Sequence, residues 1–154
     1  MTGDQKPRLP TLRERALKLL ARREHSRAEL ARKLSAHAED PAEVEAVLDD
    51  CERRGWLSEN RVVEQRVHTL RTRYGARRIE RDLLARGVSG EAVAAALSGL
   101  KGNELEAARE VWSRKFGGRL PRTPAERAKQ ARFMQGRGFD MDVIMKVIKG
   151  VSEE

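Results

Sequence analysis

Five arginines crowd the stretch over residues 73–93, RYGARRIERDLLARGVSGEAV. Before its first glycine-valine pair the stretch holds only two acidic residues, Glu80 and Asp82. We expect Arg78 to form an ion pair with Asp82, because the two are four residues apart on a helix. The remaining guanidinium groups favour an anionic partner, such as nucleic acid or an acidic protein surface.

The spacing of this stretch predicts a helix that positions its charges. Ile79, Leu83 and Leu84 form the stripe expected to be buried. Arg77 and Arg81 lie one turn apart and are expected on the exposed side. A solvated, charged helix face is the plainer interpretation of the same pattern.

The chain repeats itself, which shows where equivalent helices lie. A shift of 49 residues aligns Leu34 with Leu83 and Val44 with Val93. A further shift of 51 residues aligns Val93 with Ile144. The predicted organisation is a flexible leader over residues 1–10, three-helix repeats over 11–58, 59–102 and 103–150, and a tail over 151–154.

Helix start and stop signals support these repeats. Gly87 and Gly138 are expected to end helices in a left-handed turn, with the next apolar residue folding back. Asp140 is expected to cap the last helix rather than to bind a metal. Four N-terminal caps with a glutamate three residues later are predicted at Thr11, Ser26, Asp40 and Thr123.

The composition suits an all-α fold of small layers. Aromatic residues make up 4% of the 154 residues and charged residues 36%, and no alternating strand pattern occurs. Small helical units usually stack on their neighbours and bury a shared seam. We therefore expect an elongated, curved array of three tandem three-helix repeats.

Charge is distributed in segments, and it recurs with the repeat. The net charge is +8 and the pI about 10.2. Residues 36–60 are strongly acidic, whereas residues 1–35, 61–86 and 101–139 are basic. The residues predicted to face an anionic partner are Arg71, Arg73, Arg77, Arg78, Arg81, Arg86, Arg127, Lys129, Arg132 and Arg137.

Signatures of catalysis or of a cofactor are absent from the sequence. It has no phosphate-binding glycine loop with a lysine, no metal-binding cysteine pair and no catalytic triad, so we expect neither an enzyme nor a cofactor. The lone Cys51 excludes an internal disulfide. With no signal-peptide or membrane-spanning apolar run, a cytoplasmic monomer is expected.

Three stretches of the chain resemble the RecX family of bacterial recombination regulators. They are ALKLLARREHSRAELARKL near the start, GWLSENRVVEQRVHTLRTRYGARRIERDLLARGV from Gly55, and RFMQGRGFDMDVIMKVIKG near the end. The resemblance covers nearly the whole chain past residue 10. The chain departs from strict repetition in the third repeat, where the loop GGRLPRT is longer.

The resemblance implies a function that the composition cannot specify. It implies a regulator that binds the RecA filament on single-stranded DNA within the filament groove. The expected consequences are inhibition of ATP hydrolysis and of strand exchange, either by blocking filament extension or by favouring filament disassembly. Some family members also contact DNA directly, and no cofactor is implied.

Two other interpretations of the sequence stay open. Short helices joined by glycine turns also occur in helix-turn-helix proteins that bind DNA on their own. The chain could equally be a helical scaffold for an unrelated acidic protein. Binding to duplex DNA or to RecA filaments separates these alternatives.

Overall fold

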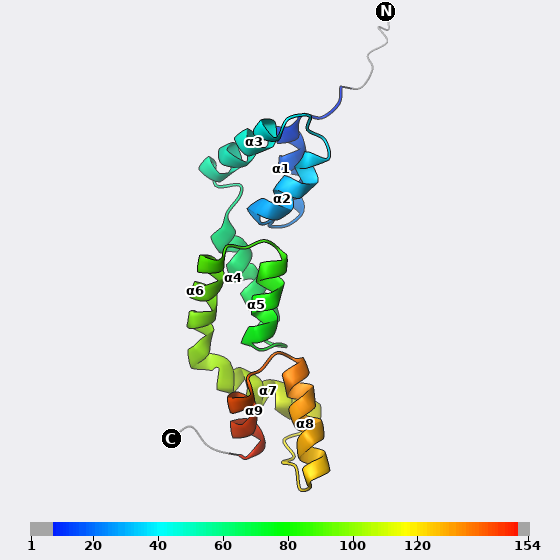
Figure 1. The fold of residues 1–154 in the computed structure, drawn as a ribbon, viewed down its shortest axis with the longest axis vertical. Coiled ribbons are helices and arrows are strands. Elements are labelled where there is room, and N and C mark those ends of the chain that lie inside the picture. The colour runs from blue at the N-terminus through cyan, green and yellow to red at the C-terminus, as the bar shows by residue number, and fades with distance from the viewer. Residues whose placement is uncertain (1–7, 151–154) are drawn as a thin grey trace, which may run out of the picture. The chain divides into compact units, whose positions relative to one another are not determined.

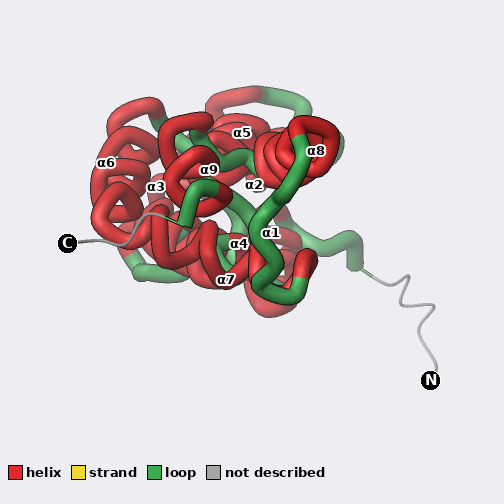
Figure 2. The backbone as a smooth tube through the Cα atoms, turned by 90° about the horizontal axis from the view of Figure 1, so that it is seen from below, coloured by secondary structure: helices red, strands yellow, loops and turns green. Residues whose placement is uncertain are grey.

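The computed structural model describes residues 8–150, and within them all regular structure is helical (Figures 1 and 2). This confirms the all-α fold. Residues 1–7 of the predicted leader and the whole predicted tail, 151–154, lie outside the described residues.

The helices follow one another in groups of three. A 3-10 turn, η1 (Lys101–Asn103), joins the sixth helix to the seventh. The α-helices are α1 (Leu12–Arg22), α2 (Arg27–Ser35), α3 (Pro41–Arg53), α4 (Glu59–Leu70), α5 (Ala76–Ala85), α6 (Gly90–Leu100), α7 (Glu104–Phe116), α8 (Pro124–Gly136) and α9 (Met141–Ile148).

The chain divides into two compact units, residues 1–62 and 63–154. The first unit contains α1, α2, α3 and the start of α4. The second contains the rest of α4 together with α5 to α9. Each unit is described below by itself.

In the first unit, α1, α2 and α3 enclose one apolar core. Leu30, Leu34 and Leu48 are fully buried there, with Ala16 and Cys51. Because these side chains recur at helical spacing on three helices, the core forms where the three apolar stripes meet.

Hydrogen bonds at the helix starts confirm the four predicted caps. The side chains of Thr11, Ser26, Asp40 and Thr123 each accept a backbone N–H from the first turn. At Ser26 the reciprocal bond also forms, because Glu29 Oε1 accepts the Ser26 N–H at 3.0 Å. Glu126 instead accepts the backbone N–H of Arg122, at 2.7 Å. The glutamate in this motif therefore does not always close the box.

Equivalent positions of the repeats are buried alike. Leu34, Leu83 and Met134 are all 0% exposed, as the repeat spacing requires. Gly87 and Gly138 have φ of +78° and +91°, which confirms the predicted left-handed helix ends. Leu84, expected in the buried stripe, is 50% exposed. That prediction is wrong because Leu84 lies about 100° around the helix from Leu83.

The third repeat carries a polar side chain where the others carry an aliphatic one. Gln130 occupies the position of Leu30 and Ile79, and it is buried. Its side chain accepts from Trp112 Nε1 at 2.8 Å and donates to the Arg119 carbonyl at 3.0 Å. A buried amide is tolerated when it is hydrogen-bonded in this way. Gln130 therefore anchors the longer loop of this repeat to α8.

Candidate functional site

Two glycines bring the second and third repeats into backbone contact inside the second unit. The Gly75 N–H donates to the Arg137 carbonyl at 2.7 Å, and the Arg77 N–H donates to the Gly138 carbonyl at 3.1 Å. A Cβ atom on Gly75 would lie 2.5 Å from the Gly138 oxygen. A Cβ on Gly138 would lie 2.6 Å from the Arg78 Cβ. Only residues without a Cβ fit this crossing, which we call the glycine junction.

Cations and aromatic rings alternate beside the glycine junction. The Arg78 guanidinium lies 4.8 Å from the Tyr74 ring centroid, and Arg137 lies 5.2 Å from both Tyr74 and Phe133. Lys115 Nζ lies 5.1 Å from the Phe133 centroid. Such distances are within the range of attractive cation–π contacts. We call these five residues the cation–aromatic stack.

The stack draws its residues from four places in the chain. Tyr74 follows α4, Arg78 lies on α5, Lys115 lies on α7, and α8 with its C-cap supplies Phe133 and Arg137. Within residues 8–150 none of its three cations forms an ion pair with a carboxylate. Their positive charge is therefore held in place without being cancelled.

Further contacts tie the repeats together around the stack. Arg114 of α7 donates to the Thr72 carbonyl after α4. Arg77 forms an ion pair with Asp140. Asp140 does stand at the N-cap of α9, but its side chain contacts Arg77 rather than the helix amides. The predicted capping role of that carboxylate is therefore wrong.

A carboxylate reinforces the junction from α7. Glu104 faces the backbone amides of Ala76 and Asp140, at the starts of α5 and α9. Burial raises the pKa of the Glu104 carboxyl, and the nearby Asp140 charge raises it further. The oxygen Oε1 is buried, and no residue between 8 and 150 forms a hydrogen bond with it.

One predicted ion pair of this region does not form. Arg66 of α4 and Arg86 donate to the carboxylate of Asp82, at 2.9–3.0 Å and 3.1 Å. Burial raises the pKa of Asp82, but the two arginines outweigh it, so the net shift is downward. Arg78 lies over Tyr74 instead of pairing with Asp82.

The predicted anion-facing residues thus fall into different settings. Two of them, Arg78 and Arg137, belong to the cation–aromatic stack. Arg77 and Arg86 are paired with acids, and Arg71 lines a pocket that also contains glutamates. The other five are exposed: Arg73, Arg81, Arg127, Lys129 and Arg132.

Four residues that build the site were not predicted from the sequence. Lys115 and Phe133 complete the stack, and Arg114 holds the turn that carries Tyr74. Tyr74 is the fourth, and its ring contacts Arg78 and Arg137. The available signal was the interleaving of aromatic and basic residues in RYGARR, at the start of α5, and in RFMQGRGF, at the end of α8.

Two other kinds of site are not found in the described part of the chain. Between residues 8 and 150, no helix has the length and apolar character that crossing a membrane requires. The same residues contain no group of three His, Cys, Asp or Glu side chains arranged to hold a metal ion.

Comparison with known proteins gives consistent matches along the chain. Family models for the first, second and third three-helix domains of RecX match residues 13–51, 58–97 and 103–148. The regulatory protein RecX of Leptothrix cholodnii is 50% identical over 152 residues, covering 99% of this chain and 96% of its own. That of Ralstonia nicotianae is 47% identical over 145 residues, covering 94% and 91%.

A solved structure agrees with the fold. The crystal structure of RecX from Lactobacillus salivarius aligns with a TM-score of 0.78 at 16% identity, covering 91% of this chain and 94% of that one. At that identity the likeness concerns the fold alone. The family models and the curated relatives together show that this chain belongs to the RecX family of regulatory proteins.

Proposed function

We propose that this protein is a negative modulator of the RecA recombinase. It binds the groove of the RecA filament on single-stranded DNA and inhibits ATP hydrolysis, filament extension and strand exchange. Membership of a family of regulatory proteins supports the regulatory role. The resemblance of the three sequence stretches supports the choice of partner.

The observation that carries this proposal is the cation–aromatic stack. Arg78, Arg137 and Lys115 hold three positive charges close together, with no carboxylate of the described residues paired to them. Uncompensated surface charge attracts oppositely charged surfaces and accelerates association. An acidic recombinase surface or the phosphates of its DNA would meet this requirement.

The test measures ATP hydrolysis by RecA on single-stranded DNA while this protein is titrated in. We expect inhibition at much less than one regulator per recombinase protomer, too little to coat the DNA. Direct DNA binding is measured in parallel at two salt concentrations. Unchanged hydrolysis combined with strongly salt-dependent DNA binding would contradict the proposal, because that result indicates phosphate contacts alone.

Matched variants assign the activity to the stack. Exchanging Arg78 and Lys115 for glutamine should raise the concentration for half-inhibition about tenfold, because two exposed charges are lost. The control exchanges Lys18 and Arg32, which are exposed cations of the first unit. Circular dichroism should show equal helical content in both. Equal inhibition by both folded double variants would place the contact elsewhere.

A second candidate function is binding to DNA without RecA. It is favoured by the exposed cations Arg127, Lys129 and Arg132, all on one helix of a three-helix unit. This function predicts strong, sequence-selective binding to duplex DNA in the absence of RecA. Binding assays with scrambled duplexes measure that selectivity directly.

A further inference from the structure

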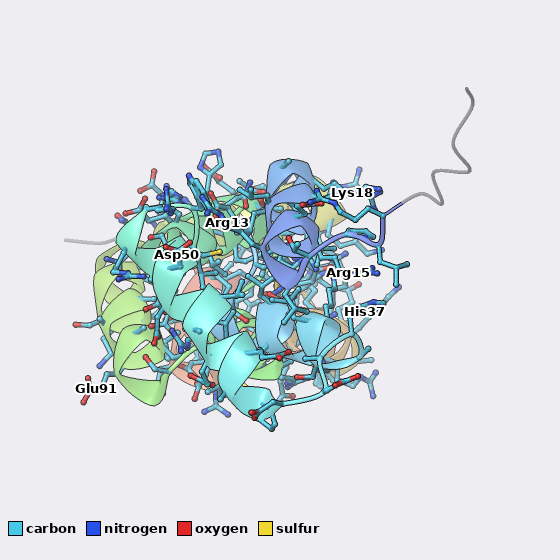
Figure 3. The ribbon with its side chains drawn as sticks, turned by 90° about the horizontal axis from the view of Figure 1, so that it is seen from above. Arg13, Arg15, Lys18, His37, Asp50 and Glu91 are labelled. Atoms are coloured by element: carbon cyan, nitrogen blue, oxygen red, sulfur yellow. The ribbon has the colours of Figure 1, made fainter. Side chains whose placement is uncertain are left out.

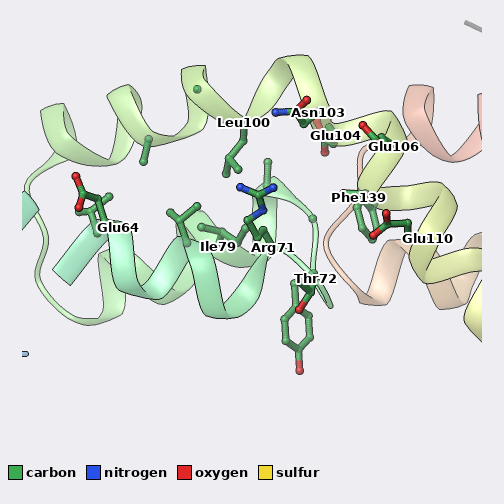
Figure 4. A pocket seen from close by; sticks show the side chains of 18 residues that line it. Glu64, Arg71, Thr72, Ile79, Leu100, Asn103, Glu104, Glu106, Glu110 and Phe139 are labelled. Atoms are coloured by element: carbon green, nitrogen blue, oxygen red, sulfur yellow. The ribbon is translucent and has the colours of Figure 1, made fainter. Parts of the chain in front are cut away.

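The second unit contains a pocket of about 450 Å³ next to the cation–aromatic stack, and Tyr74 belongs to both. Residues of α4, α6 and α7 line it, together with the start of α5 (Figure 4). Its walls contain small residues where larger ones would close it: Ala96 and Gly99 on α6, and Ala107 on α7. The hollow therefore follows directly from residue size.

The interior of the pocket is apolar. Val67, Leu100 and Ile79 line it, and Phe139 closes one end. Ile79 and Phe139 are almost fully buried, so the pocket reaches the packed interior of the unit. An aliphatic side chain entering here would leave water for an apolar surface, which is favourable.

The polar lining has the opposite charge to the protein as a whole. Four glutamates, Glu64, Glu104, Glu106 and Glu110, line the pocket against a single cation, Arg71 (Figure 4). The chain carries a net charge of +8, so this acidic lining stands out from its surroundings. Charge complementarity therefore selects a cation as the polar part of any occupant.

Two polar side chains of the pocket lining make fewer hydrogen bonds or ion pairs with the described residues than they could. Oε1 of Glu104 is buried and has no hydrogen-bond partner in the described part of the chain. Arg71 forms no ion pair with an acidic residue of the described chain. Its guanidinium extends toward Leu100 in Figure 4, along the apolar lining. The chain's own arginine thus shows the type of side chain that this space accommodates.

We propose that this pocket docks a segment of a partner protein in which an aliphatic residue neighbours an arginine or lysine. The aliphatic side chain enters between α4, α6 and α7. The cationic group lies among the glutamates, with its methylene stem along the apolar wall. Arg71 competes with the incoming cation and weakens its binding. The inference does not require RecA to be the partner.

The probes are three matched tripeptides: acetyl-Leu-Arg-Leu-amide and its versions with Gln or Glu in the centre. Titrations are followed by amide chemical shifts of the full-length, isotope-labelled protein. We expect the arginine peptide to shift residues of α4, α6 and α7 and to bind more tightly than the glutamine peptide. The glutamate peptide should bind least. Equal binding of all three would overturn the proposal.

Variants separate the pocket from general electrostatics. Exchanging Glu106 and Glu110 for glutamine should weaken the arginine peptide about fivefold. The control exchanges Glu91→Gln and Asp142→Asn, which remove two exposed charges of the same unit outside the pocket. Arg71→Gln should tighten binding. An equal loss in the control variant would contradict the assignment to the pocket.

A blocking variant tests the location without weakening the fold. A Cβ on Gly99 meets nothing within 4 Å, so Gly99→Met projects into open space and improves helix propensity. We expect it to abolish peptide binding, and binding that survives would overturn the proposal. Benzamidine serves as a free organic cation. If it binds while the arginine peptide does not, the docking of a protein segment is excluded.

Discussion

The two units of this protein differ in how far acidic residues neutralise their positive charges. Residues 1–62 hold 13 Lys or Arg against 12 Asp or Glu, whereas residues 63–154 hold 19 against 12. In the first unit Arg27 contacts Glu45, Asp49 and Glu52 at 2.6–2.9 Å. These contacts, that with Glu52 first, raise the pKa of Arg27. Among residues 8–150, no acid pairs with the cations of the cation–aromatic stack.

Aromatic rings contact arginines in both units, so the units differ in the nearby carboxylates and not in the rings. Arg13 and Arg54 lie 5.3 Å and 5.1 Å from the Trp56 centroid. Both also reach Asp50, at 3.8 Å and 3.1 Å, and Figure 3 shows Arg13 and Asp50 on neighbouring helices. The hydrogen bond from Arg54 is the main reason that the pKa of Asp50 is lowered. An aromatic face fixes a cation, whereas a carboxylate fixes it and cancels its charge.

The largest expected effect comes from disrupting the glycine junction, which supports the cation–aromatic stack. Gly75→Ala places a Cβ 2.5 Å from the Gly138 oxygen, against backbone that cannot rotate away. We expect the free energy of unfolding of the second unit to fall by about 3 kcal/mol, at the upper end for overpacking. Urea denaturation followed by circular dichroism measures this. Inhibition of RecA should fall as well, because Tyr74 and Arg137 separate.

The matched control is Gly136→Ala in α8, close to the junction in sequence. A Cβ there meets nothing within 4 Å and the residue is helical, so stability should rise slightly. If Gly75→Ala and Gly136→Ala unfold at the same urea concentration, the glycine junction does not support the second unit.

The repeat could be predicted from the sequence because burial follows local periodicity. Val44, Val93 and Ile144 recur at nearly constant spacing, and all three are buried. The four helix caps were equally predictable, since each depends on residues within one turn. Such features need no knowledge of how distant helices pack.

The site was less predictable because it depends on long-range packing. Helical spacing offers Asp82 two arginine partners, Arg78 and Arg86, and cannot say which is formed. Arg66 of α4 forms hydrogen bonds with Asp82, and Arg78 lies over the Tyr74 ring instead of contacting Asp82. No local sequence pattern predicts the approach of Arg66 from another helix, whereas the contact between Tyr74 and Arg78 spans only four residues.

The second prediction separates stability from binding. Arg27→Gln removes the charge that faces three carboxylates, so unfolding free energy should fall by about 1 kcal/mol while RecA inhibition stays constant. Arg78→Gln should do the reverse, weakening inhibition with little change in stability. Urea denaturation and the hydrolysis assay are run on both variants. The contrast between the units fails if the two variants change the same quantity.

The smallest expected effect concerns a proton added to His25. This residue lies in the first unit, where acidic and basic residues are nearly equal in number. His25 is 1% exposed, and its Nδ1 lies 3.0 Å from the Arg23 carbonyl. Its Nε2 lies 2.9 Å from Lys33 Nζ, a contact in which the ammonium donates to a neutral ring. Glu29, whose negative charge acts on His25, is already bonded to Ser26 and Arg23. A proton on the ring would therefore find no free acceptor.

The direction of the pH effect follows from this environment. Burial is the main cause that lowers the pKa of His25 below 6.5, so the unfolded chain binds a proton more readily. The stability that neutral His25 contributes is thus fully present above pH 6.5. It is lost as the pH falls through the lowered pKa of the folded state, by at most about 1.4 kcal/mol per pH unit. His25→Gln, which keeps one donor and one acceptor, should reduce the slope of the urea midpoint against pH between pH 7.5 and 5.5. His37→Gln, at an exposed position, should leave the slope unchanged, and an equal slope in the wild type and His25→Gln would refute this role of His25.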